Sequence, residues 1–153
     1  KNYFSKKIGI IMDKDNYYMN LALEEAKKAY LLDEVPIGCV IVYQDRVLSS
    51  FYNRKTLDRV ATYHAEILAI NDACLKMGSW YLDECTLYTT VEPCMMCTGA
   101  IIQSRVRRVV YGCDNHDFGY LSHLENKKIV VTPHVMEAEC REVMHRFFQD
   151  KRK

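Results

Sequence analysis

Apolar and polar positions follow a helical period near the start of the chain. In residues 16–32, apolar side chains recur every three or four positions, which predicts an amphipathic helix. Asp15 directly precedes this stretch and is the expected N-cap of the helix. Residues 1–15 show little pattern and are predicted to form an N-terminal extension, so a single domain is expected over residues 16–153.

Short apolar runs further along the chain predict strands. Residues 39–43 and 46–52 flank a Gln44-Asp45 turn and are expected to pair as an antiparallel hairpin. Residues 53–62 and 114–128 are predicted to be loops. Three further strands are expected, at 85–90, 105–112 and 129–132, and three further helices, at 64–77 (with Gly78 as C-cap), 94–104 and 135–151. Strands that alternate with helices indicate a three-layer α/β/α domain.

Composition narrows the class of protein. The 153 residues are enough for one domain, and 49% apolar with 27% charged residues is typical of a globular protein. A net charge of +1 gives no global electrostatic reason for nucleic-acid binding. The sequence contains no apolar run of about 18 residues and no signal peptide, so we expect a cytoplasmic protein without membrane segments. Seven cysteines in a reducing compartment do not predict a disulfide framework.

Four side chains with metal or acid–base chemistry occur in two short stretches. His64 is followed two residues later by Glu66, and Cys94 is followed three residues later by Cys97. One imidazole and two thiols supply three zinc ligands, whereas a structural zinc site normally has four protein ligands. The count therefore favours a catalytic zinc ion with one position open to water. A histidine alone is more often a core or surface residue, and a lone C-x-x-C pair is ambiguous between zinc and redox chemistry.

Glu66 distinguishes a reactive zinc site from a static one. Both stretches are predicted to open helices, so two helix N-termini can converge on one ion. Glu66 is close enough to take a proton from a zinc-bound water without being a ligand itself. The resulting hydroxide could attack a ring carbon that carries an amino group, and ammonia would leave. The alternative is that Glu66 is only a helix-start acid stabilised by the helix dipole.

These motifs resemble the H-x-E and P-C-x-x-C signature of the zinc-dependent cytidine/deoxycytidylate deaminase superfamily. The chain is most similar to the branch of bacterial tRNA adenosine deaminases, over about residues 16–150. The similar segments are residues 33–38, 63–67, 85–88, 92–100 and 104–106. The resemblance implies a cytidine-deaminase-like fold with a five-stranded mixed sheet, one Zn²⁺ per subunit, a homodimer, and a tRNA anticodon stem-loop as partner. It implies hydrolytic deamination of adenosine to inosine at the wobble position by a zinc-bound hydroxide.

The same resemblance implies roles for individual residues. His64, Cys94 and Cys97 would hold zinc, and Glu66 would be the catalytic proton shuttle. Further residues would bind the substrate: the Asn53 side chain and the Ala65 backbone would hydrogen-bond the target base, and Val35 and Pro36 would help to wall the pocket. Without the resemblance, Asn53 would be interpreted as a loop residue that caps a turn.

The segment after the fourth predicted strand departs from the family pattern. Asn115 stands where the family has an acidic residue, and Phe118, Tyr120 and His123 replace small residues. These aromatic groups could stack on flipped bases or close the site over a smaller substrate. Two alternatives therefore stay open: a deaminase of a free nucleobase or nucleoside of the guanine, cytosine or adenine type, and a zinc-stabilised RNA-binding module without turnover.

Several basic side chains are candidates for phosphate contacts, and a solvated helix face is the alternative interpretation for each of them. They are Arg105, Arg107, Arg108, Arg141, Arg146 and residues 151–153.

Overall fold

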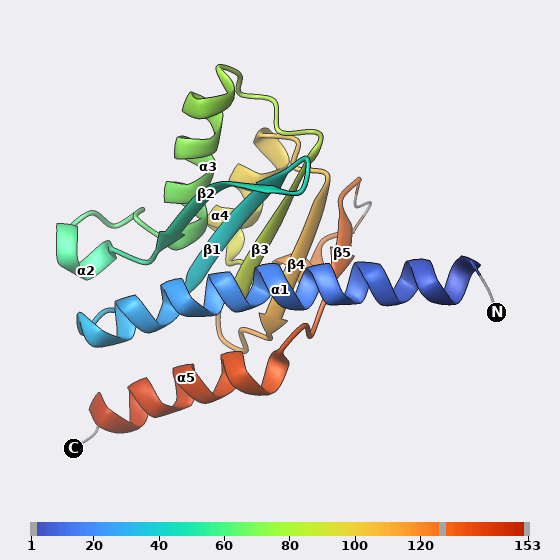
Figure 1. The fold of residues 1–153 in the computed structure, drawn as a ribbon. Coiled ribbons are helices and arrows are strands. Elements are labelled where there is room, and N and C mark those ends of the chain that lie inside the picture. Colours follow the sequence, from blue (N-terminus) through green and yellow to red (C-terminus); the bar gives the residue numbers. More distant parts are fainter. Residues whose placement is uncertain (1–2, 126–127, 152–153) are drawn as a thin grey trace.

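A five-stranded mixed sheet lies at the centre of the protein, seen in a computed structural model that describes residues 3–125 and 128–151 (Figure 1). Its order is β2-β1-β3-β4-β5. The pairs β1–β2 and β1–β3 are antiparallel, whereas β3–β4 and β4–β5 are parallel. The strands are β1 (Gly38–Tyr43), β2 (Arg46–Tyr52), β3 (Cys85–Val91), β4 (Arg108–Cys113) and β5 (Val130–Thr132). The prediction of a five-stranded mixed sheet is confirmed.

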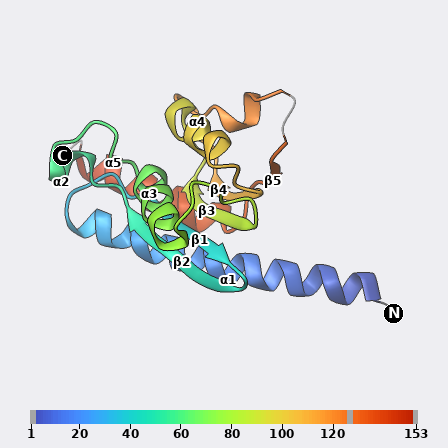
Figure 2. The same cartoon turned by 90° about the horizontal axis from the view of Figure 1, so that it is seen from above.

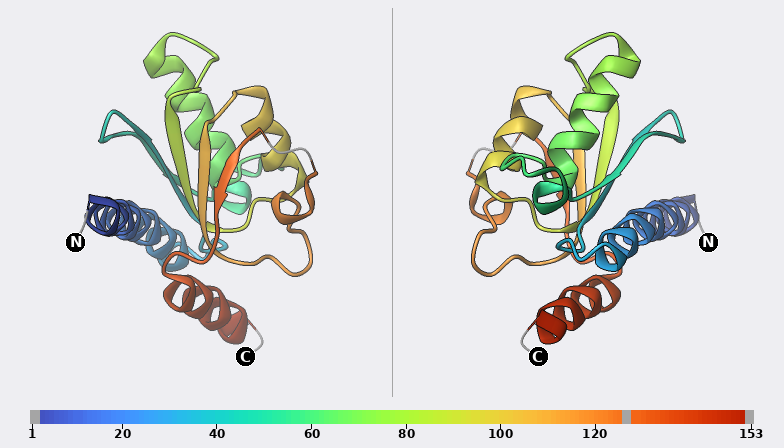
Figure 3. Two further views of the ribbon diagram at one scale, coloured as in Figure 1. Left: turned by 90° about the vertical axis from the view of Figure 1, so that its right-hand side faces the viewer. Right: turned by 90° about the vertical axis from the view of Figure 1, so that its left-hand side faces the viewer.

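Helices cover both faces of this sheet. α1 (Tyr3–Leu31) and α5 (Glu137–Lys151) pack on one face, and α3 (Ala65–Met77) packs on the other beside α4 (Met95–Gln103) (Figure 3). Each face has its own apolar core, because successive strand residues point to opposite sides: Val40 and Val110 face α1 and α5, whereas Ile41 and Val109 face α3 and α4. The predicted three-layer arrangement is confirmed.

α1 begins much earlier than the sequence pattern predicts. It starts at Tyr3, and its first turns extend past the sheet, with almost every side chain of residues 3–14 exposed (Figure 2). Apolar periodicity arises from packing against a core, and these turns have none to pack against, so the pattern gives no signal there. Once the packed part of a helix has formed, adding further turns is much easier than nucleating a new helix.

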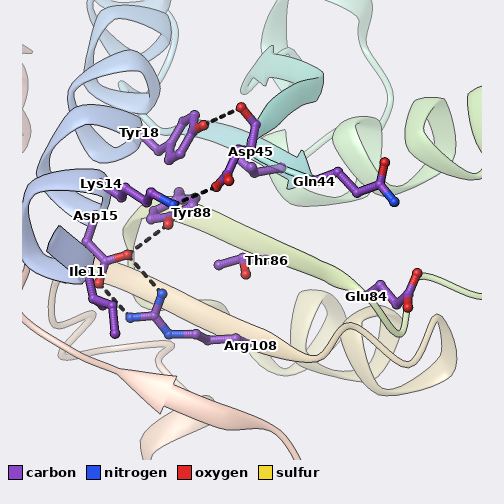
Figure 4. A pocket seen from close by; sticks show the side chains of 11 residues that line it. Ile11, Lys14, Asp15, Tyr18, Gln44, Asp45, Glu84, Thr86, Tyr88 and Arg108 are labelled. Atoms are coloured by element: carbon purple, nitrogen blue, oxygen red, sulfur yellow. Dashed lines mark hydrogen bonds and ion pairs between the residues drawn. The ribbon is translucent and has the colours of Figure 1, made fainter. Parts of the chain in front are cut away.

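Asp15 is not the N-cap that the sequence predicts, because it lies in the middle of α1 and is buried. Arg108 from β4 donates to both of its carboxylate oxygens, at 2.8 and 2.5 Å, and the Tyr88 hydroxyl donates to Oδ1 at 2.8 Å (Figure 4). This bidentate ion pair joins α1 to the sheet and lines a polar cavity of about 280 Å³. Asp15 therefore stabilises the contact between α1 and the sheet and does not cap a helix.

Other boundaries shift where the backbone adopts left-handed conformations. β4 starts at Arg108 and not at residue 105, because Arg105 has φ 60°. α5 starts at Glu137 and not at residue 135, because Met136 has φ 54°. The predicted loop at 53–62 contains a one-turn helix, α2 (Lys55–Asp58), and the loop at 114–128 contains a 3₁₀ turn, η1 (Leu121–His123). Within the described residues, no helix combines the length and apolarity needed to cross a membrane.

Candidate active site

The structure brings together the three predicted metal ligands, which come from sequence positions thirty residues apart. His64 is the N-cap of α3, Cys94 is the N-cap of α4, and Cys97 lies in the first turn of α4. The Nδ1 atom of His64 lies 3.7 Å from Sγ of Cys94 and 3.5 Å from Sγ of Cys97. Two helix N-termini therefore converge on one point, as the motifs predict.

The spacing of these donor atoms fits a tetrahedral zinc ion. Zinc bonds of about 2.3 Å to sulfur and about 2.0–2.1 Å to nitrogen place tetrahedral N and S ligands about 3.5 Å apart. The measured N–S distances are 3.5 and 3.7 Å, and the three donor atoms all lie within 4.8 Å of one another. One nitrogen and two thiolate donors are a set that zinc prefers, and a tetrahedron built on three protein ligands leaves one position for a water.

The electrostatics of this cluster favour a thiolate. Hydrogen bonds from Cys97 and His64 lower the pKa of Cys94 to about 3, and the same contact with the Cys94 sulfur raises the pKa of Cys97. The hydrogen bond to Cys94 also raises the pKa of His64. The thiolate at Cys94 lies at the start of α4, where unpaired backbone N–H groups point outward and stabilise negative charge.

Glu66 lies beside these ligands and is buried, with 4% of its surface exposed. Burial raises its pKa to about 7, and a hydrogen bond to its own backbone N–H, the nearby His64 and a hydrogen bond with Thr89 partly offset that rise. A carboxyl group with a pKa near neutrality can both accept and donate a proton under physiological conditions. The position of Glu66 in the first turn of α3, as the sequence predicts, therefore suits a proton shuttle better than a solvated helix-start acid.

Asn53 lies in the interior and is not an exposed cap of a turn. Its Nδ2 donates to Oε1 of Glu34 at 3.1 Å, and its exposed fraction is 5%. The other oxygen of Glu34 accepts the backbone N–H groups of Thr56 and Leu57, at 2.9 and 2.8 Å, in the short helix α2. The next residue, Arg54, donates its backbone N–H to the carbonyl of Tyr63, so this segment runs directly alongside the metal-ligand turn.

The other residues expected to contact the substrate are Val35, Pro36 and Ala65. Pro36 is buried and Val35 is half-buried, and they lie between Glu34 and Ile37, which both hydrogen-bond Asn53. Ala65 is buried at the first position of α3, where a backbone N–H has no acceptor within the helix. The hydrogen bonds of Glu34 and Ile37 join residues 34–37 to Asn53, and the bond from Arg54 to Tyr63 joins the Asn53 segment to the turn that carries His64.

Sequence reasoning missed two buried acids that hold this site together, Glu34 and Glu92. Each is nearly inaccessible to solvent, at 1% and 4% exposure. Each stands directly before a motif, in E-V-P-I-G and in E-P-C. A glutamate within an apolar stretch that contains proline is a candidate for burial, and a buried carboxylate needs hydrogen-bond donors as partners. The apolar neighbours of these two glutamates were therefore the signal in the sequence that could have revealed their role.

Comparison with known proteins agrees with this geometry. A model of the MafB19-like deaminases matches residues 12–152. The chain belongs to the MafB19-like deaminase family. The tRNA-specific adenosine deaminase of Bacillus subtilis (strain 168) is 38% identical to this deaminase over 150 residues, which cover 93% of each chain. The family resemblance predicted from the motifs is confirmed.

Two solved structures share the fold of this deaminase. One, from work on A-to-I editing by tRNA:A34 deaminases at the wobble position of transfer RNA, has a TM-score of 0.79 and 36% identity, covering 83% of this chain and 98% of that chain. The other, the guanine deaminase of Nitrosomonas europaea, has a TM-score of 0.76 and 25% identity, covering 84% and 81%. The fold is therefore compatible with both nucleic-acid and small-molecule substrates.

Most of the basic side chains that were candidates for phosphate contacts form ion pairs with acidic residues of this deaminase. Arg108 binds the buried Asp15, and Lys151 lies 2.6 Å from Asp33. Arg141 and Arg146 pair with glutamates on α5, at 2.8 and 3.2 Å. The two remaining arginines, 105 and 107, are exposed and line a cavity of about 600 Å³. Residues 152–153 of the predicted basic tail lie outside the described residues.

Proposed function

We propose that this deaminase converts adenosine to inosine in a tRNA anticodon stem-loop, at the wobble position, by hydrolysis. The observation that carries the proposal is the convergence of His64, Cys94 and Cys97 on one point, with the buried acid Glu66 beside it. The relatives that support a tRNA substrate are 36–38% identical over nearly the whole chain. Overall, water adds to the base and ammonia leaves.

His64, Cys94 and Cys97 would hold one zinc ion in each subunit. When bound, zinc supplies a water whose pKa is lowered towards neutrality. The carboxylate of Glu66 would accept a proton from that water and pass it to N1 of the adenine ring. The same carboxyl group would then carry the second proton to the amino group, which departs as ammonia. Burial keeps bulk water away from this carboxylate, so its protons are delivered to the substrate.

The adenine would be held by groups from three segments of the chain. The Asn53 side chain, fixed by Glu34, would hydrogen-bond one edge of the base, and the Ala65 N–H at the start of α3 would bond another. Val35 and Pro36 would form the apolar wall. Because Glu34 holds Asn53 before substrate arrives, little side-chain entropy would be lost on binding.

A deaminase of free bases is the second candidate function. The likeness to the guanine deaminase of Nitrosomonas europaea favours it. A zinc-stabilised RNA-binding module without turnover fits less well. Within the described residues, the His64 cluster has three protein ligands, whereas a purely structural site normally has four.

Incubation with an anticodon stem-loop, with total tRNA and with a panel of free bases and nucleosides distinguishes these functions. We expect inosine and ammonia from the RNA and almost no turnover of guanine, cytosine, adenine or their nucleosides. Turnover of a free base with none of RNA would establish the second function. Stoichiometric zinc and RNA binding without ammonia from any substrate would establish the third.

The remaining expectations follow from the family resemblance. We propose a homodimer in the cytoplasm, with residues 16–153 as the deaminase domain. Sedimentation analysis at several protein concentrations tests the dimer, and removal of residues 1–11 tests whether the exposed turns of α1 are dispensable for activity.

A further inference from the structure

Glu92 holds the loop that follows β4 against the metal-ligand turn. Its Oε1 accepts the backbone N–H of Asn115 at 3.3 Å, and its Oε2 accepts the backbone N–H of Ser122 at 2.9 Å. Its side chain is buried, with 4% of the residue exposed. One carboxylate therefore fixes both ends of an eight-residue segment, 115–122, which we call the clamped loop.

Two backbone contacts place the middle of the clamped loop beside the zinc ligands. Gly119 forms an antiparallel bridge with Cys94, and the N–H of Tyr120 donates to the carbonyl of Pro93 at 3.0 Å. A Cβ atom on Gly119 would lie 2.4 Å from Oε1 of Glu92, so only glycine fits between this carboxylate and the loop. Residues 92–94 thus bind the loop through its backbone and leave its side chains available.

Two aromatic side chains flank Gly119 in the clamped loop. Phe118 is 74% exposed and Tyr120 is 36% exposed. Because the ends of the loop are already fixed, little conformational entropy is lost when a partner binds and covers the exposed Phe118. Unstacked RNA bases are typically bound by stacking on such side chains.

We propose that Glu92 is a positioning residue, which clamps residues 115–122 against the Cys94 turn so that Phe118 and Tyr120 contact the nucleotides flanking the reacting adenosine. This inference rests on the proposed function, and it names the part of the protein that selects RNA. A free base would reach Glu66 and Asn53 without contacting Phe118 or Tyr120. An RNA loop would depend on them, because its neighbouring bases must be held while one base is turned into the site.

The clamp is tested with Glu92→Gln, which keeps the side-chain volume and removes one acceptor oxygen. Loss of a hydrogen bond to a charged group generally shifts the equilibrium between the closed and open loop by about tenfold or more. We expect backbone amides of residues 115–122 to exchange with deuterium about tenfold faster. We expect KM for an anticodon stem-loop to rise by a similar factor, with kcat changed much less and zinc content unchanged.

Three further variants separate positioning from folding. Gly119→Ala should reproduce both effects from the loop side, because its Cβ displaces the carboxylate. Phe118→Ala should raise KM for RNA while loop exchange stays normal, since it removes a contact and not the clamp. The control is Glu125→Gln, which removes a charge from an exposed position just beyond the loop and should change neither exchange nor KM.

Normal loop exchange in Glu92→Gln would overturn the inference. So would fast exchange with unchanged KM and kcat on RNA, since the loop would then have no part in substrate selection. If the wild-type protein made no inosine from any RNA, the proposed function would fail. The exchange rates and the binding of the stem-loop by the variants would still decide whether Glu92 positions an RNA-contacting loop.

Discussion

The side-chain amide of Asn53 donates a hydrogen bond to the Glu34 carboxylate, and both residues are buried. Glu34 also accepts two backbone N–H groups of α2, which lie 22 and 23 positions further along the chain, so it joins its own segment to the segment of Asn53 and α2. A buried carboxylate with three donors is stable only while the donors remain in place. The orientation of Asn53 in the site therefore depends on Glu34.

Glu34→Gln is expected to weaken substrate binding and stability together. The amide cannot accept all three N–H groups, so about 1–3 kcal/mol of unfolding free energy should be lost. KM for the stem-loop should rise about tenfold, corresponding to about 1.4 kcal/mol of positioning. Urea unfolding and steady-state kinetics measure both effects. Glu24→Gln, at an exposed position of α1, is the control, and equal behaviour of the two variants would refute a positioning role for Glu34.

Local patterns were sufficient to predict the hairpin and the first turns of α3 and α4. The turn at Gln44, the C-cap at Gly78 and the apolar runs between them are signals carried by neighbouring residues. The same holds for His64 and Cys94, whose placement at helix N-caps follows from their own segments. For this reason the predicted metal ligands came together as expected.

Features that depend on distant partners were not predictable in this way. Asp15 resembles a helix cap in sequence, but its partner Arg108 lies ninety-three positions away. Glu92 is adjacent to a recognisable motif, yet its role depends on the backbone of a loop whose path the sequence does not indicate. The first turns of α1 lack a packing partner on the sheet, and so they lack the periodicity by which helices are recognised.

Removing one partner of the Asp15–Arg108 pair should strongly destabilise the protein. Asp15→Ala leaves a half-buried guanidinium without its carboxylate, and breaking a buried pair in this way costs about 3–5 kcal/mol. The double variant Asp15→Leu/Arg108→Met should be less destabilised than the sum of its single changes. Chemical unfolding measures the four free energies. Arg107→Ala, at the exposed neighbouring position, should change stability by less than about 0.5 kcal/mol; strict additivity in the cycle would contradict a coupled pair.

Substitution by alanine should have opposite effects on stability at two glycines. At Gly38 a Cβ would lie 1.9 Å from the carbonyl oxygen of Ala22, so Gly38→Ala must push α1 away from β1 and strongly destabilise the protein. At Gly99, an exposed position inside α4, a Cβ meets no atom within 4 Å. Gly99→Ala should stabilise by roughly 0.5–1 kcal/mol through helix propensity. Thermal unfolding compares the two, and similar shifts of Tm would show that the contact of α1 with Gly38 is not tight.

The central claim is that Glu66 moves the protons of a hydrolytic deamination at the His64, Cys94 and Cys97 site. The most direct measurement is inosine formed per chain in an anticodon stem-loop, by wild type and Glu66→Ala, with zinc content measured on the same samples. We predict that Glu66→Ala retains stoichiometric zinc and loses activity by about 10²–10⁴-fold or more. Substantial inosine formation by zinc-loaded Glu66→Ala would contradict the account.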